Sequence, residues 1–254
     1  MKFLVEKVEK DLIFDFTFIL KKCKEYYDWL GEELEIKYCN NDIPHNLENP
    51  DEYIPVGSIE FVSNYLKEYY PNAIETIKPI NVPESLFKYA GRKIVNCTDY
   101  KHQNLDLFYN NFEYGDNLYR KSNKDLKDPS NGIVKYTDDF SFVDYQVSEV
   151  IDVLSEWRIF VHHNEIKYIS NYGGDPTVFP DLSRIYAMIS DYSKEAPVAY
   201  TLDVGIGHKY TNYTFIMEVH RFFSCGLYGF SDLKTIPIML AQTWNEMKRY
   251  KKKD

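Results

Sequence analysis

The sequence has 254 residues, of which 44% are hydrophobic, 27% charged and 17% aromatic, a composition typical of a soluble globular protein with ample material for a core. The formal net charge of −9 argues against a protein that coats nucleic acid, because such proteins carry a basic face. The four cysteines form no CxxC pair, and charged residues interrupt the N-terminal segment. The sequence therefore indicates no disulfide framework, zinc site, signal peptide or membrane span, and we expect a cytoplasmic protein.

Short strands and a helix are predicted at the start of the chain. Phe3–Val5 and Leu12–Phe18 are β-like runs, although Thr17–Leu30 could also continue as a helix. Glu35–Cys39 is predicted as a strand. Asn40–Pro55 is rich in Asn, Asp and Pro, which predicts a loop.

Two further helices are predicted before the middle of the chain. The first is stopped by Pro71, and its apolar residues recur on one face, at Phe61, Val62, Tyr65, Leu66 and Tyr69. The second runs from Glu84 to Tyr89 and is ended by Gly91.

The second half of the chain is rich in strands. Glu156–Ser170 predicts a hairpin with a His-Asn turn, and Asn171–Pro176 predicts a turn or flexible loop. The other predicted elements are strands at Leu118–Lys121, Ile133–Tyr136, Tyr145–Leu154, Tyr200–Gly207 and Tyr213–His220, and helices at Asp181–Tyr192 and Thr235–Tyr250. Helices that precede and interrupt so many strands indicate an α+β fold.

Two lysines, Lys121 and Lys127, flank a polar loop that ends in Asn131-Gly132. Lysines at the base of a hairpin suit triphosphate oxygens, because each is a compact point charge on a long stem. The alternative is a solvated loop with incidental lysines, and this feature alone favours that alternative.

Residues Ser148–Phe160 read SEVIDVLSEWRIF. Unpaired backbone groups at the end of the first strand could bind an adenine edge, and Glu156 could accept hydrogen bonds from ribose hydroxyls. Arg158, on the same face as Glu156, could clamp a transferred phosphoryl group. An amphipathic strand with a Glu156–Arg158 salt bridge at its surface explains the same residues equally well.

A carboxylate and a histidine interrupt the apolar run FIMEVHRFF. Glu218 and His220 stand two positions apart, so a strand would point both to one face. Asp203 lies on the strand expected to pair with theirs. Carboxylates combined with phosphate oxygens and water are typical of Mg²⁺ sites. The alternative, which these residues alone favour, is a buried hydrogen-bonded pair.

In their order along the chain, these pieces resemble the ATP-grasp superfamily, and most closely its compact, divergent clade of bacteria and phages, related to the eukaryotic cell-division-cycle-type ATP-grasp proteins. The segments that carry the resemblance are Pro55–Val62, Ala90–Ile94, Tyr119–Lys127 with Gly132, Ser148–Val161, Leu202–Ile206 and Met217–His220. The resemblance implies an α+β fold in which two α+β lobes clasp ATP. It implies a variable N-terminal α/β region at 1–85, a small lobe with phosphate-binding lysines at 86–147, and a C-terminal lobe with hinge and metal site at 148–254.

The same resemblance implies roles for individual residues. Arg158 and Lys127 are the expected catalytic residues, and Asp203 and Glu218 the expected ligands of Mg²⁺. The residues expected to bind ATP are Lys121, Lys127, Glu149, Val150, Ile151, Glu156, Arg158 and His220. The family usually has Asn where this chain has His220, so the role of His220 stays open between metal, phosphate and water.

The chemistry implied by the resemblance is ATP- and Mg²⁺-dependent ligation. A carboxylate is activated as an acyl-phosphate and attacked by an amine or another nucleophile, with a protein or peptide among the candidate substrates. Tyr172–Asp175 is the expected loop that shields the intermediate or contacts the acceptor. A nucleotide-binding assembly or regulatory protein without ligase activity, and a structural protein with a buried polar network, are the alternatives. No membrane contact is expected, and the site of action is the host cytoplasm if the gene is carried by a phage.

Overall fold

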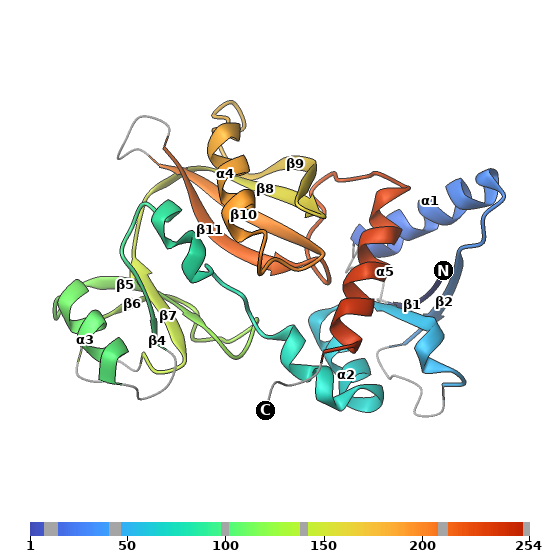
Figure 1. Ribbon diagram of the computed structural model, residues 1–254, viewed down its shortest axis with the longest axis horizontal. Coiled ribbons are helices and arrows are strands. Elements are labelled where there is room, and N and C mark those ends of the chain that lie inside the picture. Colours follow the sequence, from blue (N-terminus) through green and yellow to red (C-terminus); the bar gives the residue numbers. More distant parts are fainter. Residues whose placement is uncertain (8–14, 41–46, 98–101, 138–141, 208–212, 251–254) are drawn as a thin grey trace.

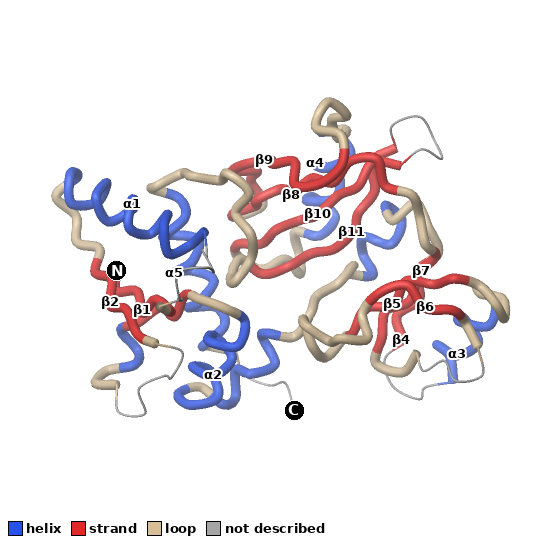
Figure 2. Tube along the Cα trace, turned by 180° about the vertical axis from the view of Figure 1, so that it is seen from behind, coloured by secondary structure: helices blue, strands red, loops and turns tan. Residues whose placement is uncertain are grey.

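The computed structural model describes residues 1–7, 15–40, 47–97, 102–137, 142–207 and 213–250. Within these residues the chain forms three sheets, which lie side by side (Figure 1). The N-terminal sheet lies at one end of the molecule and a small four-stranded sheet at the other (Figure 2). A second four-stranded sheet, built from the later part of the chain, lies between and above them in the view of Figure 1.

The N-terminal sheet is parallel and has β1 in its centre. Its core also takes in the C-terminal helix, since the Tyr65 and Trp244 rings pack edge to face with centroids 5.5 Å apart. The first and last parts of the chain therefore share one core. The elements of this region are β1 (Lys2–Glu6), α1 (Asp15–Leu30), β2 (Glu35–Cys39), η1 (Pro50–Glu52), β3 (Tyr53–Val56), α2 (Ile59–Tyr69), η2 (Pro71–Ile77) and α5 (Thr235–Lys248).

Helix α2 follows from its sequence as predicted. The Ser58 hydroxyl caps its N-terminus by accepting a hydrogen bond from the Phe61 N–H at 3.1 Å. Its apolar face, which includes Phe61 and Leu66, is buried in the core. The helix stops before Pro71, because proline would remove a backbone donor and clash with the preceding turn.

The small sheet is antiparallel, with strand order β4-β7-β5-β6. Helix α3 packs on one face, where Phe108 joins Leu118 and Val147 in a separate apolar core. The opposite face turns toward the rest of the molecule. The elements are β4 (Ile94–Cys97), α3 (His102–Asn111), β5 (Asn117–Ser122), β6 (Gly132–Lys135) and β7 (Tyr145–Glu149).

The larger antiparallel sheet has the strand order β11-β10-β8-β9. One face is covered by helix α4 and the short 3₁₀ helix η3, and alternate residues such as Ile159, Leu202 and Val204 point into the core between them. On the other face, Phe160 is buried in the core shared with the N-terminal sheet, and Arg158 and Asp203 lie on the same face. The elements are η3 (Glu84–Tyr89), β8 (Val153–His162), β9 (Glu165–Gly174), α4 (Leu182–Tyr192), β10 (Ala199–Gly207) and β11 (Tyr213–Arg221).

The predicted hairpin turn and helix cap are confirmed in this sheet. His163 and Asn164, between β8 and β9, both have positive φ, 50° and 60°, as a two-residue turn of this hand requires. The Asp181 side chain caps α4 by accepting hydrogen bonds from the Ser183 and Arg184 N–H groups.

Three sequence predictions were wrong about local structure. Asp15–Phe18 lies in α1 rather than in a strand, which confirms the alternative of a helix at Thr17–Leu30, while residues 12–14 lie outside the described part of the chain. The predicted loop 40–55 contains the first residues of β3; Pro55 is tolerated there because β3 is an edge strand of its sheet. The predicted strand Tyr145–Leu154 is divided between β7 and β8.

The predicted loop at Tyr172–Asp175 is also wrong for its first three residues, which continue strand β9. Gly174 has φ +70°, and a Cβ there would lie 2.1 Å from the Leu154 carbonyl oxygen. Glycine is therefore required for close approach to the neighbouring strand, not for a turn.

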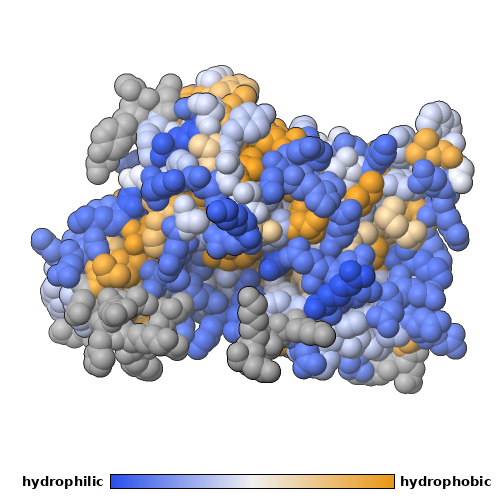
Figure 3. Space-filling view, viewed as in Figure 1, coloured by the Kyte–Doolittle hydropathy of each residue, from blue (hydrophilic) through white to orange (hydrophobic). Residues whose placement is uncertain are grey.

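No helix in the part of the chain that the structure describes is long and apolar enough to cross a membrane. On the face shown in Figure 3, hydrophilic residues predominate and the hydrophobic surface is divided into separate patches.

Candidate active site

A cavity of about 450 Å³ lies between the two four-stranded sheets. Both sheets and the segment that joins them contribute side chains, so the cavity exists only where the two meet. Its walls combine charged, aromatic and aliphatic groups, as small-molecule sites do. The lining residues are Arg92, Tyr119, Lys121, Ile133, Ser148, Glu149, Val150, Ile151, Val153, Glu156, Tyr172, Phe215, Met217 and Glu218.

The segment between β7 and β8 forms one end of the cavity. Glu149, the last residue of β7, forms two hydrogen bonds with the backbone of Lys93. The Glu149 N–H donates to the Lys93 carbonyl at 3.1 Å, and the Glu149 carboxylate accepts from the Lys93 N–H at 2.8 Å. The backbone of Ile151 makes no hydrogen bond within the described residues. An unpaired backbone donor and acceptor therefore border the cavity here.

Arg158 and Asp203 form a buried ion pair next to the cavity. They face each other across β8 and β10, with Arg158 8% and Asp203 2% exposed. The guanidinium Nε and Nη2 donate to the two carboxylate oxygens of Asp203 at 2.8 and 2.6 Å, and Nη1 donates to the Gly226 carbonyl at 3.1 Å. Burial lowers the pKa of Arg158, but the hydrogen bond and the charge of Asp203 raise this pKa by more than burial lowers it. The net shift of the Arg158 pKa is therefore upward.

Two tyrosine rings cover this ion pair. Tyr172 and Tyr228 stack with centroids 5.1 Å apart, and the Arg158 guanidinium carbon lies 5.6 and 5.0 Å from their centroids. Such rings stabilise a cation and restrict the movement of the guanidinium. Tyr172 also lines the cavity and donates a hydrogen bond to the Met217 sulfur at 3.9 Å.

An irregularity in β11 brings Glu218 into the cavity. Asp203 pairs with Glu218 but Val204 pairs with Ile216, so Met217 is the extra residue of a β-bulge. Ile216 therefore points into the core beneath α4, whereas both Met217 and Glu218 line the cavity. The predicted pairing of Asp203 and Glu218 on neighbouring strands is confirmed.

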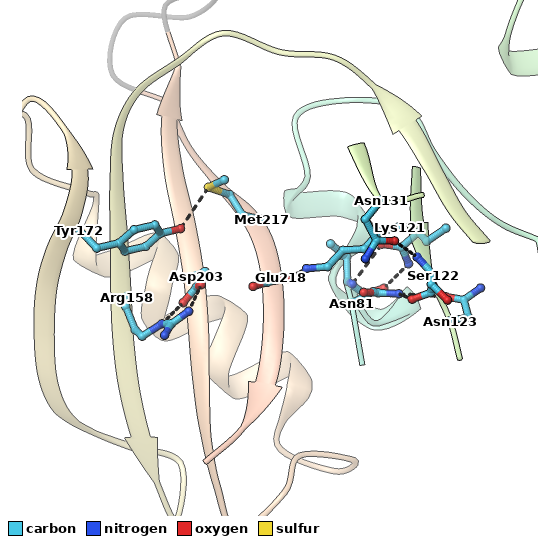
Figure 4. A network of polar contacts seen from close by, with 12 residues as sticks. Asn81, Lys121, Ser122, Asn123, Asn131, Arg158, Tyr172, Asp203, Met217 and Glu218 are labelled. Carbon is cyan, nitrogen blue, oxygen red and sulfur yellow. Dashed lines mark hydrogen bonds and ion pairs between the residues drawn. The ribbon is translucent and has the colours of Figure 1, made fainter. Parts of the chain in front are cut away.

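Lys121 lies opposite Glu218 and forms an ion pair with it across the cavity (Figure 4). Lys121 comes from β5 of the small sheet and Glu218 from β11 of the larger sheet, so the pair bridges the two sheets. Burial lowers the pKa of Lys121 to about 8, although Asp203 opposes this shift. A partly dehydrated ammonium group of this kind would gain from an additional anion.

Arg92 is a cavity residue that sequence reasoning did not single out. Its guanidinium donates to the carbonyls of Ala90 and Ile216 at 3.1 and 2.9 Å and to the Ser148 hydroxyl at 3.2 Å. Burial lowers its pKa to about 10. In the sequence, its signals are a basic residue after the glycine that ends η3 and its place in Ala90–Ile94, one of the segments that carry the resemblance.

Other missed residues lie on β5 and β11. Tyr119 stands two positions before Lys121, so strand alternation places it on the cavity face and could have identified it. Phe215 and Met217 also line the cavity. Alternation would have placed Met217 and Glu218 on opposite faces, and only the bulge unites them.

Four of the predicted site residues do not line the cavity: Arg158 and Asp203 form the ion pair beside it, and Lys127 and His220 lie apart from it. Lys127 is in the loop after β5, where its ammonium group donates to both carboxylate oxygens of Glu60 on α2 at 2.7 and 2.8 Å. His220 donates from Nδ1 to the Arg221 carbonyl at 2.5 Å and packs against the Phe223 ring. Burial lowers the pKa of His220 to about 4, so the imidazole is neutral near pH 7.

The carboxylates of Asp203 and Glu218 are chemically suited to a hard divalent cation. Magnesium sites commonly employ one or two protein carboxylates and complete the shell with phosphate oxygens and water. In the described residues, no group of three histidine, cysteine or acidic side chains could hold a metal. A metal here would therefore depend on these two carboxylates and on oxygens from a ligand.

Comparisons with known proteins agree on one fold. The family model described as "ATP-grasp domain, R2K clade family 2" matches residues 89–237. Among solved structures, D-alanine–D-alanine ligase from Bacillus anthracis in complex with ATP is 13% identical, with a TM-score of 0.50 over 98% of this chain and 99% of that chain. D-cycloserine synthetase is 7% identical, with a TM-score of 0.53 over 98% of this chain and 100% of that chain. No curated protein matches by sequence.

Proposed function

Because the chain belongs to the ATP-grasp domain family, R2K clade family 2, we propose that it is an ATP- and Mg²⁺-dependent ligase that activates a carboxylate as an acyl-phosphate. The observation that carries the proposal is the cavity between the two four-stranded sheets, with an unpaired backbone at one end and paired charges at the other. The matched residues 89–237 include both sheets. We infer that 86–147 and 148–254 are the two lobes that clasp ATP.

Adenine would bind at the end of the cavity formed by Glu149, Val150 and Ile151. The free N–H and C=O of Ile151 suit the hydrogen-bonding edge of a purine, and Ile133 and Phe215 supply apolar walls for its faces. Glu156, which also lines the cavity, is the proposed acceptor for the ribose hydroxyls.

The phosphates would lie toward Lys121 and Arg92. Both side chains are cations with pKa values lowered by burial, to about 8 and about 10, so neutralising a phosphate relieves part of their desolvation. Lys127, which is paired with Glu60 outside the cavity, would need to leave that carboxylate to act on a phosphate.

Asp203 and Glu218 are the residues proposed to hold Mg²⁺, which would neutralise phosphate charge during phosphoryl transfer. In the structure each carboxylate is neutralised by a protein cation instead, Asp203 by Arg158 and Glu218 by Lys121. If these carboxylates bind a metal, Lys121 and Arg158 become available to the phosphates. Before nucleotide binds, Lys121 and Arg158 neutralise the two carboxylates. After a metal has taken their place, the same two cations would stabilise the negative charge of the reacting phosphate.

One observation favours a second candidate, a nucleotide-binding protein of the same fold that does not ligate. The Asp203 carboxylate is held by two hydrogen bonds from Arg158, whose remaining terminal nitrogen is bound to the Gly226 carbonyl. A pair so firmly held could persist when nucleotide binds. The protein would then bind ATP without bringing both groups to the phosphates.

An assay of ADP formation separates the two candidates. Purified protein is incubated with Mg·ATP and panels of carboxylates and amines, with amino acids and peptides included as candidate substrates. ADP formation that requires both substrates supports the ligase, whereas ATP binding without turnover in any panel supports the second candidate. Absence of ATP binding, measured by thermal shift with Mg·ATP and Mg·ADP, would contradict both.

A further inference from the structure

Asn81 lies at the junction of the two sheets, in the segment between η2 and η3. It is 2% exposed and has a positive φ of 56°. Asparagine and glycine adopt this backbone conformation at the lowest cost. A buried polar residue in this conformation needs a structural explanation, and its hydrogen bonds supply one.

Asn81 is bonded to both sheets at once. Its carbonyl accepts from the Val219 N–H at 2.8 Å, as an isolated bridge on the edge of β11. Its side-chain amide donates to the Ser122 carbonyl at 2.9 Å, at the end of β5. Val219 directly follows Glu218, and Ser122 directly follows Lys121 (Figure 4). One residue therefore fixes the backbone next to each member of the ion pair.

The orientation of the Asn81 amide is determined by its partners. Its nitrogen also donates to the Asn123 Oδ1 at 3.0 Å, and the Asn123 nitrogen donates in turn to the Asn96 Oδ1 at 2.9 Å. Both partners of the Asn81 nitrogen are thus acceptors, while the buried Asn81 Oδ1 has no donor within the described residues. The position requires a donor on a short side chain, which glycine lacks and aspartate cannot supply.

The next residue attaches the same segment to the small sheet. The Val82 N–H donates to the Gln146 Oε1 at 3.1 Å, and the Gln146 amide donates back to the Val82 carbonyl at 2.9 Å. Gln146 is the cross-strand neighbour of Lys121. The connecting segment is consequently bonded to the residue that follows Lys121 on β5 and to the residue opposite Lys121 on β7. Through its carbonyl, Asn81 bonds the same segment to β11.

We propose that Asn81 is a positioning residue that sets Lys121 opposite Glu218 across the cavity. Without its amide, the end of β5 loses its direct bond to the segment that is bonded to β11, and the remaining bonds of Val82 and Arg92 hold the two sheets less closely at the ion pair. The expected consequence for nucleotide binding rests on the function proposed above, but the placement of the two charges does not.

The placement is measured by zero-length crosslinking with a water-soluble carbodiimide in the absence of nucleotide. The reagent activates a carboxylate, and only an amine in direct contact forms an amide. The Lys121–Glu218 crosslink is quantified by mass spectrometry in the wild type, Asn81→Gly and Asn81→Asp. Both variants tolerate the positive φ and keep the backbone carbonyl, but neither can donate to Ser122.

Two controls separate positioning from general loosening. Asn49→Gly makes the same substitution at an exposed asparagine with φ 54° and no side-chain capping bond. The Lys2–Glu52 pair, 2.6 Å apart in the N-terminal region, gives an internal reference crosslink in every sample.

We expect both Asn81 variants to lose most of the Lys121–Glu218 crosslink relative to the Lys2–Glu52 reference, with Asn49→Gly like the wild type. We also expect their affinity for Mg·ATP to fall about tenfold or more, as small misplacements at active sites do. Unchanged crosslinking in a folded Asn81→Asp protein would overturn the positioning role. Loss of the crosslink in a protein whose wild type binds no ATP would support positioning and contradict the proposed function instead.

Discussion

The two ends of the cavity differ in how ready they are for a ligand. At the Ile151 end, backbone groups are unpaired and the walls are apolar. At the other end, Lys121 is paired with Glu218 and the neighbouring Arg158 with Asp203, while Arg92 is held by carbonyl and hydroxyl oxygens. The first end can accept a flat, polar-edged group without rearrangement. The second must exchange partners, so its energetics depend on what the ligand offers in place of each ion pair.

The largest effect is expected from breaking the buried pair at the charged end. Arg158→Met leaves Asp203, 2% exposed, without its cation, which should destabilise the fold by about 3–5 kcal/mol. Thermal and denaturant unfolding measure this loss. The double variant Arg158→Met with Asp203→Leu should be markedly more stable than Arg158→Met, because no buried charge is left unpaired; equal stability of the two would contradict this account.

The next effect concerns nucleotide affinity rather than stability. Lys121→Met removes one of the two cations that line the cavity and should weaken ATP binding about tenfold or more, as expected for a charge-assisted hydrogen bond. Isothermal titration calorimetry measures the change. Lys24→Met, on the surface of α1 and paired only with Asp28 in the described residues, is the matched control and should bind ATP like the wild type.

A smaller effect is expected at the apolar end. A Cβ on Gly205 would lie 2.4 Å from Cζ of Phe215 and 3.1 Å from the Met217 sulfur. Gly205→Ala should push the ring into the space proposed for adenine and weaken ATP binding about fivefold, within the range of overpacking costs. Adding Phe215→Leu should restore much of the loss. A double variant no better than Gly205→Ala would show that the ring is not the cause.

The smallest effect is expected at Lys127. Its exposed pair with Glu60 lies outside the cavity lining, and such surface pairs contribute about 0–1 kcal/mol to stability. We expect Lys127→Met to change ATP affinity less than about twofold. A loss as large as that of Lys121→Met would instead mean that Lys127 moves into the cavity when nucleotide binds, as predicted from the sequence.

The sequence was sufficient to predict the fold and part of the site, where a regular pattern of residues determines the structure. The α+β ATP-grasp fold was predicted correctly, because strand alternation and the order of the segments survive in the sequence. The pairing of Asp203 with Glu218 followed from the same alternation. The placement of Met217 and Glu218 on the same face of β11 could not be predicted from alternation, because a β-bulge adds one residue and no local sequence pattern indicates it.

Long-range contacts were the other limit. Arg92 acquires its role from partners as distant in sequence as Ile216, and α5 shares the core of the N-terminal sheet although it ends the described chain. The partner of Lys127 is on α2, 67 residues earlier. Such contacts depend on how the sheets are assembled, whereas the motifs report only which residue types are present.

We propose that nucleotide binding exchanges the protein's own cations for a metal at Asp203 and Glu218. The most direct test is calorimetric titration with ATP, with and without Mg²⁺, of the wild type and of Glu218→Gln. Glu218→Gln keeps the shape of the side chain but removes its charge. We expect Mg²⁺ to strengthen ATP binding in the wild type and this gain to be largely lost in the variant. An equal gain from Mg²⁺ in both proteins would contradict it.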